Sequence, residues 1–152
     1  MMEVLNIFLL AMTPVGELRV AVPVALLVYN LNWFWAYFIS IIGNMVPVIF
    51  LLLFLSPVSR WLSKKLSFCD KFFNWLFERS RRKSSPRMEK YGAIALITFV
   101  AIPLPFTGAW TGSIVAFLFN IPFKKAFPLI LLGVLISGAI MLLLTQTGLW
   151  LN

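Results

Sequence analysis

The stretch Thr13-Pro14-Val15-Gly16-Glu17-Leu18-Arg19-Val20-Ala21-Val22-Pro23 places two charged side chains, Glu17 and Arg19, within an otherwise apolar region. A charge at the depth of a lipid bilayer costs about 3 kcal/mol on insertion scales unless it faces a cavity or a partner. Pro14, Gly16 and Pro23 interrupt regular helix at the same place and free backbone groups that lipid cannot satisfy. The stretch therefore predicts a polar site that is built on interrupted helix inside a membrane.

The composition of the whole chain agrees with a membrane protein. Of its 152 residues, 61% are hydrophobic and only 12% are charged, whereas soluble domains have about half apolar and about a quarter charged residues. We therefore expect one integral membrane domain over residues 1–152, located in the cell membrane.

Several classes of chemistry are excluded by residues that the chain lacks. It has no histidine and a single cysteine, Cys69, so no internal disulfide, familiar zinc or redox-metal site, or Ser-His-Asp triad can be assembled. An intramembrane aspartyl pair needs two carboxylates, and Glu17 is the only one at depth. We expect neither an enzyme nor a bound metal or cofactor.

The net charge of +8 is concentrated in the middle of the chain. Residues 57–90 hold ten basic side chains against three acidic ones: Arg60, Lys64, Lys65, Lys71, Arg79, Arg81, Arg82, Lys83, Arg87 and Lys90 against Asp70, Glu78 and Glu89. Basic residues next to spanning helices mark the cytoplasmic side of a membrane. Because the run has no nucleic-acid recognition motif, we predict a cytoplasmic linker and no nucleic-acid partner.

Part of this linker has the pattern of an amphipathic helix. Apolar residues recur at three- and four-residue spacing in Val58, Trp61, Leu62, Leu66, Cys69, Phe72, Phe73 and Leu76, and polar residues fill the opposite face. We expect a helix over 58–77 that lies on the cytoplasmic surface of the bilayer. The basic loop after it can attract anionic headgroups.

Only two of the apolar segments are long enough to cross a bilayer, which takes about 20 helical residues. These are 33–55 and about 123–150, whereas the segments 4–12, 18–29, 93–102 and 106–120 reach roughly 14–22 Å. A breaker separates the members of each short pair: Thr13 to Gly16 in the first and Pro103-Leu104-Pro105 in the second. Each pair is either one kinked spanning helix or a re-entrant hairpin.

The positive charges favour re-entrant hairpins. With re-entry, Lys124 and Lys125 share a face with the 57–90 linker, and the turn Asn30-Leu31-Asn32 and both termini lie on the outer face, where no Lys or Arg is found. Every flanking positive charge is then cytoplasmic, as the positive-inside rule requires.

A weak internal repeat supports the same architecture. A shift of 90 positions places Asn30 on Asn120, Gly43 on Gly133 and Glu17 on Thr107. We predict an all-α integral membrane fold of two inverted repeats, 1–56 and 91–152. Each repeat is a re-entrant helical hairpin plus one transmembrane helix, and the 57–90 linker joins them. Inverted repeats with broken helices that meet near mid-depth are a transporter architecture.

The broken helices predict an anion-binding pocket. The second half-helix of each hairpin directs its unpaired N–H groups toward the membrane centre. Thr13 or Gly16 can cap one of them and Thr107 the other, while Gly108 permits close backbone approach. Together with Arg19, these N-termini suit a phosphate or a carboxylate.

Glu17 opposes a simple anion pocket. It is two residues from Arg19, so the two side chains cannot face each other on one regular helix. Either the backbone there is irregular, or each side chain meets a partner from the other half. As the only proton carrier at this depth, Glu17 would have to carry any ion coupling; alternatively, it forms a buried pair that only holds the hairpins together. The six tryptophans, most of them near predicted helix ends, fit interfacial anchoring.

Two motifs carry a family resemblance: the run from Pro14 to Pro23, and Pro103-Leu104-Pro105-Phe106-Thr107-Gly108-Ala109-Trp110-Thr111-Gly112-Ser113. Together they resemble the small multi-drug export family of prokaryotic membrane proteins, which is similar in turn to the DedA/VTT superfamily. The resemblance implies paired re-entrant hairpins and proton-linked flipping of polyprenyl phosphate or other lipids. It also implies site residues Glu17 and Arg19 in the first hairpin and Pro105 and Thr107 in the second, which has no charged residue.

We therefore expect a secondary transporter or flippase for an anionic amphiphile, with the candidate binding residues Pro14, Gly16, Glu17, Arg19, Pro103, Pro105, Thr107 and Gly108. A small exporter of cationic drugs, which would pair with Glu17, is the alternative substrate class. A membrane scaffold that does not transport is the rival function. We also expect a homodimer, for which Gly108 and Gly112 or Gly133 and Gly138 offer close-packing faces.

Cysteine labelling tests the predicted topology. In a Cys69→Ser background, Lys83→Cys and Lys124→Cys should react with an impermeant thiol reagent from the same side of the membrane, and Asn32→Cys from the other. If the 4–29 and 93–120 segments span instead, Lys83→Cys and Lys124→Cys will react from opposite sides.

Overall fold

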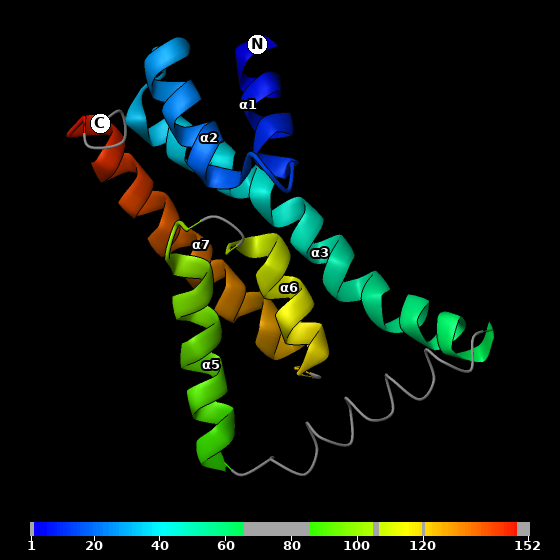
Figure 1. The fold of residues 1–152 in the computed structure, drawn as a ribbon. Coiled ribbons are helices and arrows are strands. Elements are labelled where there is room, and N and C mark those ends of the chain that lie inside the picture. The colour runs from blue at the N-terminus through cyan, green and yellow to red at the C-terminus, as the bar shows by residue number, and fades with distance from the viewer. Residues whose placement is uncertain (1, 66–85, 105–106, 120, 149–152) are drawn as a thin grey trace.

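This computed structural model describes residues 2–65, 86–104, 107–119 and 121–148, and the regular secondary structure in these residues is all helical. The elements are α1 (Met2–Met12), α2 (Glu17–Pro23), a π-helical turn η1 (Val24–Val28), α3 (Trp33–Lys65), α5 (Pro86–Ala101), α6 (Ala109–Leu118) and α7 (Phe123–Gln146). The predicted all-α fold is confirmed at this level (Figure 1).

Two helices have the length and composition of membrane spans, as the sequence predicted. They are the Trp33–Leu55 part of α3, with 23 residues, and α7, with 24. Only 39% and 33% of their most apolar windows are buried inside the protein, whereas the core helix of a soluble protein would be mostly buried. The remaining apolar surface, including Phe50, Phe54 and Leu132, is therefore left to face lipid.

The first long helix extends further than its apolar segment. α3 continues through Pro47 and Pro57 and ends at Lys65. The prediction that the spanning helix ends at Leu55 and that a separate helix starts at 58 is therefore wrong. A proline removes one donor from the helix ladder, and spanning helices tolerate this loss. Most of the predicted surface helix, and most of the basic loop after it, lie outside the described residues.

The short helices bridge the two long ones. The chain reverses after α1 so that α2 lies beside it, and it reverses again between α5 and α6 (Figure 1). α1 packs on α3 and α5 on α7, while α2 also contacts α7 and α6 contacts α3. In Figure 1 the start of α1 and the end of α7 lie toward one end of the molecule, and the end of α3 and the start of α5 toward the other.

Glycines seat the short helices on the long ones. A Cβ atom built on Gly43 of α3 would lie 2.6 Å from the carbonyl oxygen of Phe8 in α1, and one built on Gly133 of α7 would lie 2.6 Å from Cβ of Val100 in α5. Such distances are too short for any side chain. Small residues allow helices to approach this closely where lipid gives no hydrophobic force between them.

The same packing removes one argument for a homodimer. A Cβ on Gly112 would also meet Val100, one on Gly138 would meet the ring of Tyr37, and one on Gly108 would meet Glu17. The glycine faces that were expected to serve a second copy are therefore covered within the chain. The homodimer stays a prediction, without that support.

The close approach at Gly133 can be tested by a single methyl group. We expect Gly133→Ala to lower the melting temperature in detergent, because overpacking costs about 1–3 kcal/mol. Gly92→Ala on α5 is the matched control, since a Cβ there meets nothing within 4 Å and Ala is favoured over Gly in a helix by about 0.5–1 kcal/mol. Adding Val100→Ala should restore part of the loss in Gly133→Ala. Equal stability of the two glycine variants would contradict the close packing of α5 on α7.

Candidate functional site

The turn between α1 and α2 buries the Glu17 side chain. Thr13 closes this turn: its hydroxyl donates to the carbonyl oxygen of Leu10 at 2.8 Å and accepts from the backbone N–H of Gly16 at 2.9 Å. Glu17 begins α2 with a φ of +39°, a conformation that non-glycine residues rarely adopt. Its side chain is only 6% exposed. An irregular backbone therefore aims the carboxylate inward.

The carboxylate of Glu17 lies at the N-terminus of α6, in the other half of the chain. Its Oε1 accepts a hydrogen bond from the backbone N–H of Trp110 at 3.3 Å, and the backbone amide of Ala109 also interacts with it. α6 has no side-chain cap from its own N-cap residue, Gly108. Because the first N–H groups of a helix lack partners and carry partial positive charge, Glu17 supplies the missing acceptor and the complementary charge.

Gly108 makes this contact possible. Its φ is +128°, which favours glycine, and a Cβ atom at this position would overlap the Glu17 carboxylate. Gly108 was expected to permit close approach to the backbone. The group that approaches it is the acidic side chain of Glu17 in the same protein.

Arg19 binds the turn before α6. Its Nη2 donates to the carbonyl oxygen of Thr107 and to the Thr107 hydroxyl, the latter at 3.1 Å. The hydroxyl also accepts from the backbone N–H of Leu104 at 3.1 Å and lies 2.7 Å from the carbonyl oxygen of Ile102. Thr107 therefore holds its turn together and receives Arg19. It does not cap α6 as expected, because its hydroxyl points back into the turn and Gly108 takes the N-cap position.

Trp110 is a site residue that the sequence analysis did not single out. Its indole Nε1–H donates to the carbonyl oxygen of Met12 at 3.2 Å, so it satisfies a backbone group at the end of α1. Its own backbone N–H binds Glu17. Its position two residues after Gly108, at the start of a helix, is the sequence feature that could have pointed to this role. The tryptophans as a group fit interfacial anchoring instead.

The predicted site residues divide into two groups. Glu17, Arg19, Thr107 and Gly108 come together, and Gly16 forms the N-cap of α2 directly before Glu17. Pro14 is exposed in the first turn and Pro103 is half-buried in the second, so neither is buried with that group. Pro105 lies outside the described residues.

The two alternatives for the charged pair are both realised. Glu17 has an irregular backbone conformation, and Glu17 and Arg19 each bind a partner from the other half of the chain. Their opposite charges also attract each other. The arrangement places an anion, a cation and the positive end of a helix together where two breaks in helical structure meet.

Comparison with known families gives one match. The model of a family described as "putative small multi-drug export protein" matches residues 17–140. The chain belongs to this family. The match begins at Glu17 and contains Arg19 and the segment from Thr107 to Trp110, so the resemblance to the small multi-drug export family is confirmed. The comparisons with curated proteins and with solved structures found no match.

Membership gives this export-family protein a general role. A family named for export implies transport across a membrane and a role other than catalysis. The two spans agree with a location in a membrane.

The contact between Gly108 and Glu17 can be measured by a double-mutant cycle. We expect Gly108→Ala to destabilise the protein strongly, because the methyl group meets the carboxylate and the backbone is strained. Adding Glu17→Ala should remove the part of this loss that comes from the clash with the carboxylate. The two positions should therefore show a coupling of about 0.5–3 kcal/mol. Melting temperatures in detergent report both effects.

Gly148→Ala is the control for strain alone. Gly148 has a φ of +72° and nothing within 4 Å of an added Cβ, so its cost should not change when Glu17→Ala is added. If the costs of Gly108→Ala and Glu17→Ala simply add, the carboxylate does not lie against Gly108.

Proposed function

We propose that this protein is a proton-coupled secondary transporter or flippase that moves an anionic amphiphile, such as a polyprenyl phosphate, across the cell membrane. The observation that carries the proposal is the Glu17 carboxylate on the backbone amides that open α6, with Arg19 beside it. The proposal also rests on membership of a family named for export.

The position that Glu17 occupies is favourable for any anion. A helix N-terminus offers N–H donors and partial positive charge, and broken helices in transporters direct such termini at anionic substrate groups. Arg19 adds a full positive charge and a donor fork that suits phosphate. A substrate phosphate at this position would compete with the Glu17 carboxylate for the amides of Ala109 and Trp110.

This competition provides a means of proton coupling. Protonation removes the negative charge of Glu17 and weakens its hold on the α6 amides, so that a phosphate can take its place. One proton on Glu17 and one negative charge on the substrate leave the charge of the site unchanged. Among the described residues, Arg19 is the charged side chain that acts on Glu17. Proton binding and anion binding would then strengthen each other.

The helix packing supports the proposed inverted repeat. With α1, α2 and α3 matched to α5, α6 and α7, the contact of α1 with α3 inside the first half has its counterpart in that of α5 with α7 inside the second. Between the halves, the contact of α2 with α7 has its counterpart in that of α6 with α3. Gly43 and Gly133, which coincide after the shift of 90 positions, both receive the first short helix of their own half. We propose that the short pairs are re-entrant, with the 57–90 linker cytoplasmic and both termini outside.

A cationic drug is the second candidate substrate, and the family description favours it. A drug cation would pair with Glu17 in its charged form and would exchange for a proton. Arg19 opposes this, because it places a positive charge beside the same carboxylate. The two candidates differ in sign: lower pH should strengthen binding of an anion and weaken binding of a cation. A scaffold function, carried by the basic linker, would not require Glu17 at all.

Reconstituted vesicles allow these candidates to be separated. We expect the wild-type protein to bind labelled polyprenyl phosphate more tightly as pH falls, and to move it when a proton gradient is imposed. Glu17→Gln should bind without pH dependence and lose the response to the gradient. Arg19→Gln should bind about 10- to 100-fold more weakly, since hydrogen bonds to charged groups contribute about 1.5–3 kcal/mol.

Glu3→Gln is the matched control, because Glu3 is an exposed carboxylate on α1 away from the site. It should behave as the wild type. Movement of drug cations alone would select the second candidate. Movement of neither substrate, or full function in Glu17→Gln, would contradict a proton-coupled carrier.

A further inference from the structure

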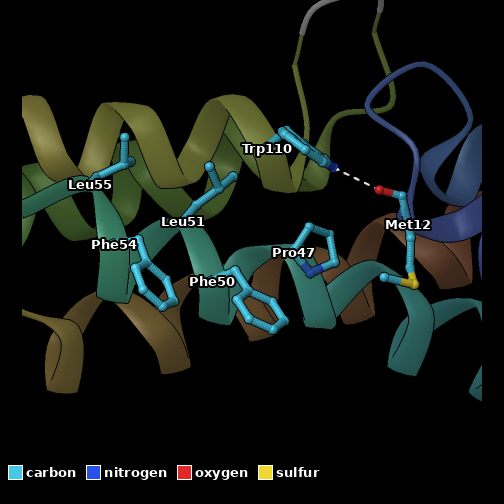
Figure 2. A pocket seen from close by; sticks show the side chains of 7 residues that line it. All are labelled: Met12, Pro47, Phe50, Leu51, Phe54, Leu55 and Trp110. Carbon is cyan, nitrogen blue, oxygen red and sulfur yellow. Dashed lines mark hydrogen bonds between the residues drawn. The ribbon is translucent and has the colours of Figure 1, made fainter. Parts of the chain in front are cut away.

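An apolar groove opens next to the Glu17–Arg19 site. It is lined by Met12 of α1, Trp110 of α6 and five residues of α3, namely Pro47, Phe50, Leu51, Phe54 and Leu55, and has a volume of about 460 Å³. Figure 2 shows Met12 and Trp110 at one end of the row and Phe54 and Leu55 at the other. The volume is in the range of about 300–1,000 Å³ that small-molecule sites have.

The α3 wall of the groove is apolar and partly exposed, as expected of a surface that faces lipid. Its five residues recur at three- and four-residue spacing, so they form one face of the helix over roughly 12 Å of its axis. They belong to the apolar span Trp33–Leu55. Phe50 and Phe54 are more than half exposed, and their rings stack at 6.0 Å between centroids. Only uncharged, apolar side chains line the groove, so its chemistry fits a hydrocarbon chain.

Trp110 connects this groove to the polar site. Its indole N–H is bound to the carbonyl oxygen of Met12, which is the bond drawn in Figure 2, so the two residues satisfy each other's polar groups and leave apolar surface toward the groove. The backbone N–H of the same Trp110 binds Glu17. One residue thus separates the carboxylate from the apolar lining.

We propose that this groove holds the hydrocarbon tail of the amphiphile whose phosphate binds at Arg19 and the start of α6. The inference rests on the proposed function and adds to it the place of the tail. Because lipid is itself apolar, the groove would gain little hydrophobic free energy over the bilayer. Its effect is to orient the tail along α3 while the phosphate lies at the polar site.

A second apolar groove provides the comparison. It lies between α1 and α3, has a volume of about 440 Å³ and is lined by Met2, Val4, Leu5, Phe8, Ile39 and Ile42. It is similar in size and chemistry but shares no residue with the polar site. An ordinary lipid chain should occupy both grooves alike, whereas the tail of a bound phosphate should select the first.

Photolabelling in vesicles tests this selection. The probe is an alkyl phosphate with a diazirine at the end of its chain, and the control is the same chain with a neutral headgroup. We expect the phosphate probe to label the α3 residues from Phe50 to Leu55 in preference to Ile39 and Ile42, and Arg19→Gln to abolish the preference. The neutral chain should label both grooves equally.

Two variants of α3 give an independent measurement. Leu51→Trp fills the first groove and should lose most transport of the alkyl phosphate, and Ile39→Trp fills the second and should keep it; size-exclusion profiles confirm that both variants fold. The inference is overturned if the phosphate probe labels both grooves alike, which indicates bulk lipid. It is also overturned if Phe54→Cys in a Cys69→Ser background gives disulfide-linked pairs, which indicates a second copy in the groove.

These outcomes are distinct from a failure of the proposed function. If the wild-type protein moves the alkyl phosphate but labelling is unselective, the tail site is wrong and the transporter proposal stands. If the wild-type protein moves no anionic amphiphile, the transporter proposal fails, and selective labelling would then show only a binding groove.

Discussion

The contact of the Glu17 carboxylate with the first amides of α6 is the interaction on which the rest of the structure depends. Because Glu17 is buried, an unpaired carboxylate and a helix start without acceptors would each be costly there. Each satisfies the other, and because they come from opposite halves of the chain, the contact also joins those halves. This contact requires glycine at position 108, since any side chain there would displace the carboxylate.

Near this contact, side chains from each half satisfy backbone carbonyl groups of the other half. Arg19 binds the carbonyl group of Thr107 in the second turn, and Trp110 binds the carbonyl group of Met12 before the first. Breaks in helices are tolerated in membranes where such partners are found. The short helices can meet in this way because Gly43 and Gly133 let them lie close against α3 and α7.

The same arrangement gives the site its chemical character. In the function that we propose, the acidic side chain at the start of α6 closes an anion-binding position until a single proton releases it. This property connects a structural contact to the transport expected of a family named for export. An apolar groove lies beyond Trp110, so a polar and an apolar surface lie on the two sides of one residue.

The sequence by itself determined the class of the protein, its two long apolar helices and the places where the other helices break, because these follow from local composition and from proline and glycine. For Glu17 and Arg19 it left two alternatives, an irregular backbone or partners from the other half of the chain, since residues two apart on a regular helix cannot pair. Only the tertiary structure decided which partners they have. The hydrogen bonds from the Trp110 N–H to Glu17 and from Arg19 to Thr107 join residues about ninety positions apart. Their geometry depends on how two turns pack together, which no local pattern encodes. For the same reason Thr107 was expected to cap α6, and the contacts of Trp110 were not predicted.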